Sequence, residues 1–379
     1  MNLYLKENFE KCMDAYAACK SNALILSNVE SLEAINEAFS QSSDVDLDLS
    51  SNAYYRIINA VPGFNKTKGL VWNVNGNTVW NTVEKSNVNA VYQIIADNGK
   101  YVLKCSNAGK YIQGVMGAMN PNMTDNGHVE FVALGNAQFN VKFGNGTMHA
   151  ENHKEGKGSN GNIVNWDGDA NSASAWYIVP ATDIEVPLTT IEDHAYATTC
   201  MPFPVSAVSG AKAYTGVLNA DADAITLNEA AGFAANEGVL LMGDANTEKA
   251  VLAIGGEATK VESNVLQGTC SAIALTDDNR ANYRVLGVNT EDNTEVGFFR
   301  PSSSVASIPA NRAYLNETLF AGLAEGLSIN FGGMVEGIAN AGVAADKVNA
   351  PVYDLTGRRV MKAVKGGVYI QNGKKFIVK

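Results

Sequence analysis

The sequence is short of charge, and of positive charge in particular. Charged residues make up 18% of its 379 residues, against about 25% in a typical soluble domain. The 28 Lys and Arg are outnumbered by 39 Asp and Glu, so the formal net charge is −11. A protein that binds nucleic acid needs a basic surface to neutralise phosphates. The composition therefore argues against a nucleic-acid partner.

Long apolar runs are missing as well. The sequence contains no uninterrupted apolar stretch of the roughly 18 residues that a membrane-spanning helix needs, so we expect no transmembrane segment. Residues 1–20 also lack the apolar core, flanked by positive charge, that marks a secretory signal peptide.

The common motifs of catalysis are absent. Neither the phosphate-binding Gly-x-x-x-x-Gly-Lys-Ser/Thr loop nor the Gly-x-Ser-x-Gly nucleophile motif occurs, and the chain has only 4 His. Acidic residues are plentiful, but no pair is singled out by its spacing as the two carboxylates of a glycosidase. We therefore expect no catalytic residues and no cofactor in this chain.

Cysteine is sparse and unpaired in the sequence. No Cys-x-x-Cys pair occurs, which excludes a zinc ribbon. Cys12 and Cys19 would lie about 10 Å apart along a helix, beyond the roughly 7 Å between bridged Cα atoms. We interpret the thiols as small buried hydrophobic groups; the 5 cysteines are Cys12, Cys19, Cys105, Cys200 and Cys270.

The residues that are abundant favour β-structure. Hydrophobic residues make up 46% of the chain, and 35 Gly and 14 Tyr point to strands and tight turns. Residues 1–45 are the exception, because apolar side chains recur there at helical spacing. We expect a short helical segment, the remnant of an upstream bundle in a longer parent. A compact helical hairpin docked on the next domain is the alternative.

Residues 54–181 repeat a pattern. Strand-like segments beginning at Tyr55, Tyr101 and Met148 are spaced 46 and 47 residues apart. Each unit closes with a small residue, a spacer, an aromatic residue and an apolar residue two places later. The closing segments are Ala90-Val-Tyr-Gln-Ile94, Ala137-Gln-Phe-Asn-Val141 and Ser174-Ala-Trp-Tyr-Ile178. Three such units can share one core around a threefold axis.

This repeat resembles a ricin-type β-trefoil, and we assign that domain to residues 46–183. The closing aromatic stands where the family has Gln-x-Trp; only Trp176 supplies the Trp, and no unit has the Gln. The resemblance implies shallow sugar pockets, each with a carboxylate or amide beside an aromatic platform.

The third unit is the richest in groups that suit a sugar. Trp166 offers a flat apolar face for a pyranose ring, and neighbouring side chains could hydrogen-bond to its hydroxyl groups. The alternative is that Trp166 packs under an Asx-rich turn. In the first unit, Trp72 and Trp80 favour packing within a hairpin over an exposed platform. The glycan-binding candidates are Asn152, His153, Asn165, Trp166, Asp167 and Asn171.

A metal site is a competing interpretation of the same unit. His149, Glu151 and His153 alternate, so on a strand they would share one face and could converge on a metal. Polar residues on the solvent face of a trefoil strand explain the pattern equally, and we prefer that explanation.

Residues 187–335 alternate apolar and polar residues over short stretches broken by Gly, Asn and Pro, which predicts an antiparallel β-sandwich. A near repeat links Phe233-Ala-Ala-Asn-Glu-Gly-Val-Leu-Leu241 to Ile308-Pro-Ala-Asn-Arg-Ala-Tyr-Leu315. The region resembles a β-rich module found in the carboxyl halves of large secreted proteins of one Gram-negative phylum, and that resemblance implies no function.

The carboxyl end carries the most specific motif. Gly- and Ala-rich residues 336–350 are typical of a linker. They lead into Val352-Tyr-Asp-Leu-Thr-Gly-Arg-Arg-Val360 and a final Lys-rich hairpin around Asn372-Gly373. Residues 351–379 resemble the carboxyl-terminal sorting domain of type IX secretion substrates. That resemblance implies outer-membrane secretion machinery as a partner and a secreted or cell-surface location.

The sequence thus predicts a mainly β, multi-domain chain: a helical segment, a β-trefoil, an antiparallel β-sandwich and a small β tail. We expect a non-catalytic carbohydrate-binding part of a secreted or surface-anchored bacterial protein, whose partner is a polysaccharide or a glycoprotein glycan. Two alternatives remain open. One is a structural surface or adhesion protein without a glycan site; the other is the carboxyl-terminal part of a secreted glycoside hydrolase or peptidase.

Overall fold

The computed structural model describes residue 49, residues 54–331 with internal gaps, and four short stretches near the carboxyl end. The expected helical segment 1–45 and the expected linker 336–350 lie outside the described residues. The gaps are 74–77, 114–118, 121–126, 152–160, 169–170, 220–223, 289–295 and 321–325, and the last stretches are 352–353, 359–360, 365 and 368–377 without 372–373.

Six strands between residues 54 and 180 close into a barrel. Going around it, β1 pairs β4, β4 pairs β5, β5 pairs β8, β8 pairs β9, β9 pairs β12, and β12 returns to β1. Every pairing is antiparallel, so the ladder has no free edge. The barrel strands are β1 (Tyr54–Asn59), β4 (Tyr92–Asp97), β5 (Lys100–Cys105), β8 (His128–Gly135), β9 (Gln138–Phe143) and β12 (Trp176–Pro180).

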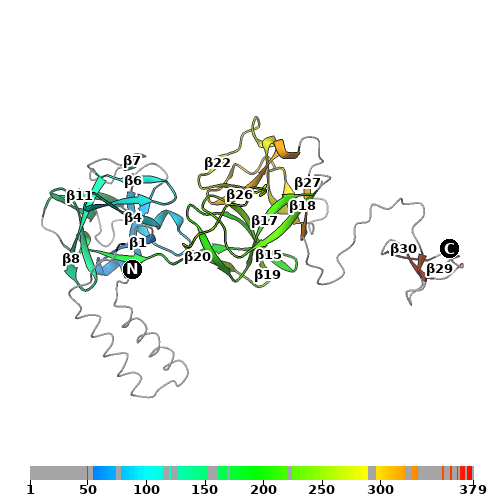
Figure 1. The fold of residues 1–379 in the computed structure, drawn as a ribbon, viewed down its shortest axis with the longest axis horizontal. Helices are drawn as coiled ribbons and strands as arrows, with labels where there is room; N and C mark the ends of the chain where they lie inside the picture. The colour runs from blue at the N-terminus through cyan, green and yellow to red at the C-terminus, as the bar shows by residue number, and fades with distance from the viewer. Residues whose placement is uncertain are drawn as a thin grey trace, which may run out of the picture. The chain divides into compact units, whose positions relative to one another are not determined.

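Three hairpins complete this region, one for each pair of barrel strands. Each begins with a strand that also pairs the preceding barrel strand: β2 with β1, β6 with β5, and β10 with β9. A closed six-stranded barrel with three hairpins is a β-trefoil (Figure 1). The hairpins are β2–β3 (Lys68–Trp72, Thr78–Thr82), β6–β7 (Lys110–Ile112, Met119–Asn120) and β10–β11 (Gly146–Ala150, Gly161–Trp166).

The trefoil core is filled by alternate residues of the barrel strands. Ile57, Ile94, Leu103, Val141 and Ile178 are fully buried in one apolar cluster. They fill the barrel because successive strand residues point to opposite sides.

The end of the second unit and the start of the third were placed wrongly from the sequence. The strand equivalent to β1 and β5 in the third unit is β9, whereas the segment that begins at Met148 is the hairpin strand β10. Phe139 therefore belongs to an opening strand, not to a closing one. In the register of β8 with β9, Val129 takes the position that Tyr92 and Trp176 hold in the other two units.

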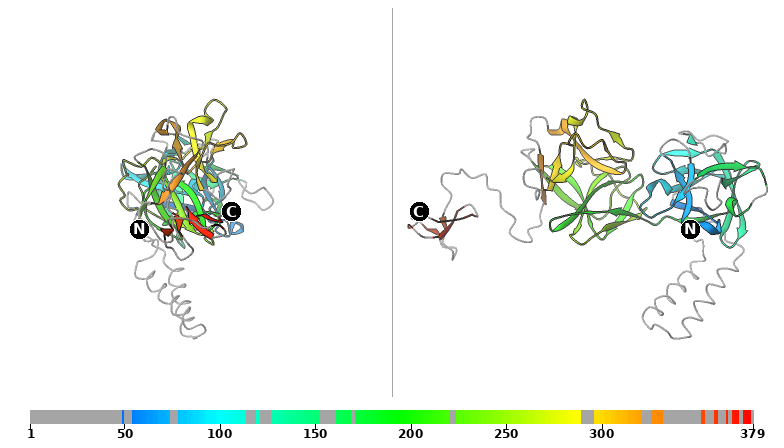
Figure 2. Two further views of the ribbon diagram at one scale, coloured as in Figure 1. Left: turned by 90° about the vertical axis from the view of Figure 1, so that its right-hand side faces the viewer. Right: turned by 180° about the vertical axis from the view of Figure 1, so that it is seen from behind.

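Residues 183–331, which we call the sandwich region, form two main antiparallel sheets and a two-stranded ribbon (Figure 2). The 3-stranded sheet runs β13 (Asp183–Pro187), β20 (Lys249–Ile254), β16 (Val205–Ser209). The 10-stranded sheet runs β14 (Thr189–Ile191), β15 (His194–Cys200), β19 (Gly238–Asp244), β17 (Lys212–Leu218), β18 (Ala224–Ala230), β27 (Gly326–Phe331), β24 (Val296–Phe299), β23 (Tyr283–Val288), β26 (Arg312–Asn316), β21 (Gln267–Thr269). The ribbon pairs β22 (Ile273–Ala274) with β25 (Ser307–Ile308).

Both faces of β19, a strand of the larger sheet, are covered. Val239 and Leu241 of β19 pack in a cluster with Leu252 of the smaller sheet. Leu240, which points to the other face, packs with Phe298 and Leu315 in a second cluster. Burial on both faces explains why β19 is a continuous apolar run, and the facing sheets confirm the expected sandwich-like arrangement.

The near repeat in the sequence corresponds to one structural turn used twice. Asn236 and Asn311 both have left-handed backbone conformations, with φ of 60° and 59°. Each is followed within two residues by a strand, β19 or β26. Asparagine tolerates this conformation better than other non-glycine residues, which explains its place in both copies.

The residues from Phe331 onward form a separate unit. Four short strands pair in the order β29 (Arg359–Val360), β28 (Val352–Tyr353), β30 (Val368–Gln371), β31 (Lys374–Ile377). The register joins Gln371 to Lys374, as a hairpin centred on Asn372-Gly373 requires. Among the residues that the structure describes, no helix has the length and apolar character needed to span a bilayer.

Candidate functional site

The strongest candidate site lies on the third trefoil hairpin. Trp166 ends β11, pairs Thr147 of β10, and is 43% exposed, one of few large apolar side chains at the described surface. An indole that is left in solvent at the end of a hairpin is available to a ligand.

The ring of His149 packs against one face of the Trp166 indole. The two rings stack with centroids 5.3 Å apart and an interplanar angle of 25°. His149 is itself buried, and its Nδ1 lies 2.8 Å from the Oγ of the fully buried Ser174. The histidine therefore holds the tryptophan ring in one orientation. Sequence reasoning missed this role. In the hairpin register Trp166 pairs Thr147, so His149, two residues further along β10, lies diagonally opposite Trp166 on the same face. A correct hairpin alignment would have indicated this contact.

Gly168 packs closely against the indole. A Cβ at this position would lie 2.6 Å from Trp166 Nε1 and 2.7 Å from its Cε2. A side chain at 168 would therefore push against the ring. We call Trp166, His149 and Gly168 together the Trp166 platform.

The polar candidates divide into two groups. Asp167 is exposed beside the platform and makes no hydrogen bond or ion pair with another described residue. Asn165 and Asn171 are exposed but already engaged: Asn165 Nδ2 donates to the Phe143 carbonyl at 3.4 Å, and Asn171 Oδ1 accepts from the Ala173 N–H at 2.9 Å. Asn152 and His153 lie outside the described residues.

The bond made by Asn171 caps a short 3₁₀ turn, η4 (Ser172–Ser174), that precedes β12. Asn87 caps the equivalent turn, η2 (Val88–Ala90), before β4 in the first unit. Because the same cap recurs in two units, Asn171 has a structural role as an Asx turn whether or not it also meets a ligand.

Two of the three metal-ligand candidates make contacts with other residues instead of pointing to a common metal position. His149 contacts Ser174 and Trp166, and Glu151 accepts a hydrogen bond from Asn162 at 3.2 Å. His153 lies outside the described residues. Within the described part of the chain, no group of three His, Cys, Asp or Glu residues is placed to hold a metal ion.

The two tryptophans of the first unit pack as the hairpin interpretation predicted. Trp80 is buried against Phe64, with ring centroids 4.6 Å apart, and its Nε1 donates to the Glu151 carbonyl. Trp72 is half-buried against the same core. Neither forms an exposed platform.

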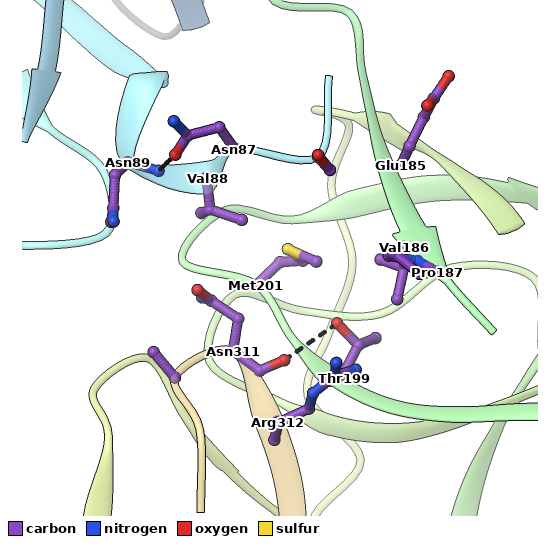
Figure 3. A pocket seen from close by; sticks show the side chains of 12 residues that line it. Asn87, Val88, Asn89, Glu185, Val186, Pro187, Thr199, Met201, Asn311 and Arg312 are labelled. Carbon is purple, nitrogen blue, oxygen red and sulfur yellow. Dashed lines mark hydrogen bonds between the residues drawn. The ribbon is translucent and has the colours of Figure 1, made fainter. Parts of the chain in front are cut away.

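Described residues also line cavities outside the hairpin. One, of about 210 Å³, is lined by Asn87 and Val88 of the trefoil and by Met201, Asn311 and Arg312 of the sandwich region (Figure 3). It is smaller than the ~300–1,000 Å³ of most small-molecule sites. Sequence reasoning had no signal for it, because its walls come from segments more than a hundred residues apart.

The second cavity, of about 540 Å³, lies wholly in the sandwich region between β14, β15, β23 and β26. Its lining is mainly aliphatic, with Leu286, Val288 and Ile308 among the contributors. Burial lowers the pKa of Arg312 at its edge. An apolar lining of this kind does not suit a sugar, which needs convergent hydrogen-bonding groups.

Comparison with known proteins returns trefoil proteins and no family. No protein-family model and no curated protein matches the chain. Among solved structures, the designed 3-fold symmetric protein ThreeFoil has 16% identity and a TM-score of 0.29, over 33% of this chain and 97% of its own. SeviL, solved with an asialo-GM1 saccharide, has 11% identity and a TM-score of 0.28, over 34% and 96%.

A larger protein shows the same part-chain likeness. An endo-β-galactosidase from Clostridium perfringens has 17% identity and a TM-score of 0.29, over 34% of this chain and 32% of its own. The chain thus corresponds to about a third of that enzyme. The fold assignment itself rests on the closed strand pairing described above.

Proposed function

We propose that the trefoil region binds a glycan through the Trp166 platform. The observation that carries the proposal is an exposed indole whose ring is fixed by stacking on the buried His149. The apolar C–H face of a pyranose packs on such a ring, and Asp167 beside it supplies a carboxylate for sugar hydroxyl groups.

The Trp166 ring is already held in one orientation before a ligand binds, which favours binding compared with a surface tryptophan that is free to rotate. The ring is positioned by His149, which the Ser174 hydroxyl positions in turn. Less side-chain entropy is therefore lost when a ligand binds. One shallow platform supports only weak binding, and weak sites gain avidity when they are linked to other domains or displayed on a surface.

The test is a glycan-array screen of the full chain beside its Trp166→Ala variant. We expect the wild type to bind a defined glycan set and the variant to lose about tenfold or more in affinity, because a stacked aromatic contributes on the order of 1.5 kcal/mol. Leu134→Ala is the matched control, since Leu134 is a comparably exposed apolar residue (48%) on β8. It should bind like the wild type.

The alternatives have distinct results. A blank array from folded wild-type protein supports a structural or adhesion role instead. Binding that survives Trp166→Ala places the site elsewhere in the trefoil.

We extend the proposal to the whole chain as a non-catalytic accessory part of a secreted or surface-anchored bacterial protein. The tail, whose motif resembles a type IX sorting domain, would engage outer-membrane secretion machinery. A catalytic domain, such as a glycoside hydrolase or a peptidase, would belong to the parent and be brought to its substrate by the trefoil.

A further inference from the structure

Two cysteines that lie far apart in the sequence meet in the sandwich region. Cys200 ends β15 and Cys270 directly follows β21, 70 residues later, yet their Sγ atoms are 3.8 Å apart. Cys200 is fully buried, whereas Cys270 is only partly buried. Two thiols in contact, one of them reachable from solvent, differ from the inert buried groups that the sequence suggested.

The backbone is shaped to bring these sulfurs together. A Cβ on Gly268 would lie 2.3 Å from Cys200 Sγ, and a Cβ on Gly238, which pairs Cys200, would lie 2.8 Å from the Leu266 carbonyl oxygen. Glycine at both positions lets β21 pack directly over the end of β15. Because alternate residues of an extended segment share a face, Cys270 is directed to the same side as Gly268.

We infer that Cys200 and Cys270 form a disulfide-exchange site, which closes into an intramolecular disulfide when it meets an oxidised thiol compound such as glutathione disulfide. The sulfurs must approach from 3.8 Å to the roughly 2.05 Å of a disulfide bond. A side-chain rotation of Cys270, which sits in the turn after β21, can supply this movement.

The two thiols have different roles. The hydrogen bond between them lowers the pKa of Cys270, and that bond together with burial holds the pKa of Cys200 well above its ordinary value. Cys270 is also the thiol that solvent can reach, whereas Cys200 is buried, so Cys270 is the nucleophile. Its thiolate attacks one sulfur of glutathione disulfide and releases a glutathione thiolate. Cys200 then loses its proton and attacks the mixed disulfide at Cys270 Sγ, which releases the second glutathione.

The reaction balances without another reagent. Two protein thiols are oxidised to one disulfide, one glutathione disulfide is reduced to two glutathione molecules, and the two protons pass to the released thiolates. Disulfides persist in oxidising compartments, where an exported protein would meet such donors. The inference does not depend on glycan binding.

The test is peptide mapping of the reduced full chain after incubation with glutathione disulfide. Digestion with trypsin, without reduction, should yield peptide 158–212 cross-linked to peptide 261–280. The number of thiols titrated in denaturant should fall by two. Cys270→Ser should abolish both changes, and Cys105→Ser, which removes a buried thiol outside the pair, should leave them intact.

Melting temperature supplies a second readout. Closing a 70-residue separation should raise the melting temperature by about 10 °C, and dithiothreitol should reverse the rise. Under reducing conditions Cys270→Ser should melt like the wild type, which shows that the variant folds. A glutathione adduct on Cys270 without the cross-linked peptide, or a link to Cys12 or Cys19, would overturn the inference.

Discussion

At the scale of single residues, burial converts ordinary side chains into groups with unusual chemistry. Cys105 is fully buried in the trefoil core, and burial raises the pKa of its thiol to about 11. The unfolded chain would lose this proton near its ordinary pKa of 9.0, whereas the folded chain keeps it. The thiol therefore makes the folded state progressively less stable as pH rises from about 9 to about 11.

Replacing Cys105 by Ser should remove this pH dependence. Serine keeps a hydrogen-bonding group of similar size but does not ionise in this range. Urea unfolding at pH 8 and pH 10.5 should show the wild type losing about 2 kcal/mol more than Cys105→Ser over this interval. Equal losses in the two proteins would show that the Cys105 thiol does not couple to folding.

At the scale of structural elements, the turn at Asn311 allows the contribution of backbone conformation to be separated from that of side-chain hydrogen bonds. Asn311 combines a left-handed backbone with two side-chain hydrogen bonds, from its Nδ2 to the Asn107 Oδ1 at 2.9 Å and to the Cys200 carbonyl at 3.2 Å. Asn311→Ala loses both bonds and strains the backbone, whereas Asn311→Gly loses only the bonds.

We expect Asn311→Ala to destabilise the chain by about 2–3 kcal/mol and Asn311→Gly by about 1 kcal/mol less. Chemical denaturation of both variants beside the wild type measures the difference. If the glycine variant is the less stable one, the side-chain bonds and not the backbone conformation decide the turn.

The elements also show what the sequence could and could not predict. Local alternation predicted short antiparallel strands over residues 187–335, and β17, β19, β23 and β24 are short strands of this kind between turn residues. The trefoil repeat was detectable, but its third unit was misplaced. The hairpin strand β10 contributes Met148 and Ala150 to the same core that alternate residues of the barrel strands fill, so their apolar patterns look alike. The three units also differ in length, because β1, β5 and β9 begin at Tyr54, Lys100 and Gln138. A repeat of constant length therefore could not locate the third unit.

The candidate site was predicted in part for a related reason. Trp166 and Asp167 were identified because a solvent-facing residue next to a turn needs only local sequence to be noticed. His149 was assigned to a metal, since a sequence cannot show that its ring lies against Trp166 across a hairpin. The contact between Cys200 and Cys270 was missed because it depends on the packing of β21 over β15, and the sequence alone does not show that Gly268 lies against Cys200, 68 residues away.

At the scale of the whole molecule, the chain divides into a large unit that ends at Asn330 and a small one that begins at Phe331. Each unit pairs its strands internally, so the tail contributes no strand to the sandwich region within the described residues. Removing residues 351–379 should therefore leave the melting temperature of the large unit unchanged within about 1 °C, and should leave glycan binding unchanged if the Trp166 platform is the site.

Export provides the contrasting readout for the same truncation. In cells that possess type IX machinery and supply a signal peptide, the full chain should reach the surface or the medium, whereas the truncated chain should remain in the periplasm. Tyr353→Pro is a subtler variant, because Tyr353 lies in β28 between β29 and β30 and proline cannot donate to the ladder of a central strand. It should reduce export without altering the large unit. Normal export of the truncated chain would remove the tail from any sorting role and leave it as a structural appendage.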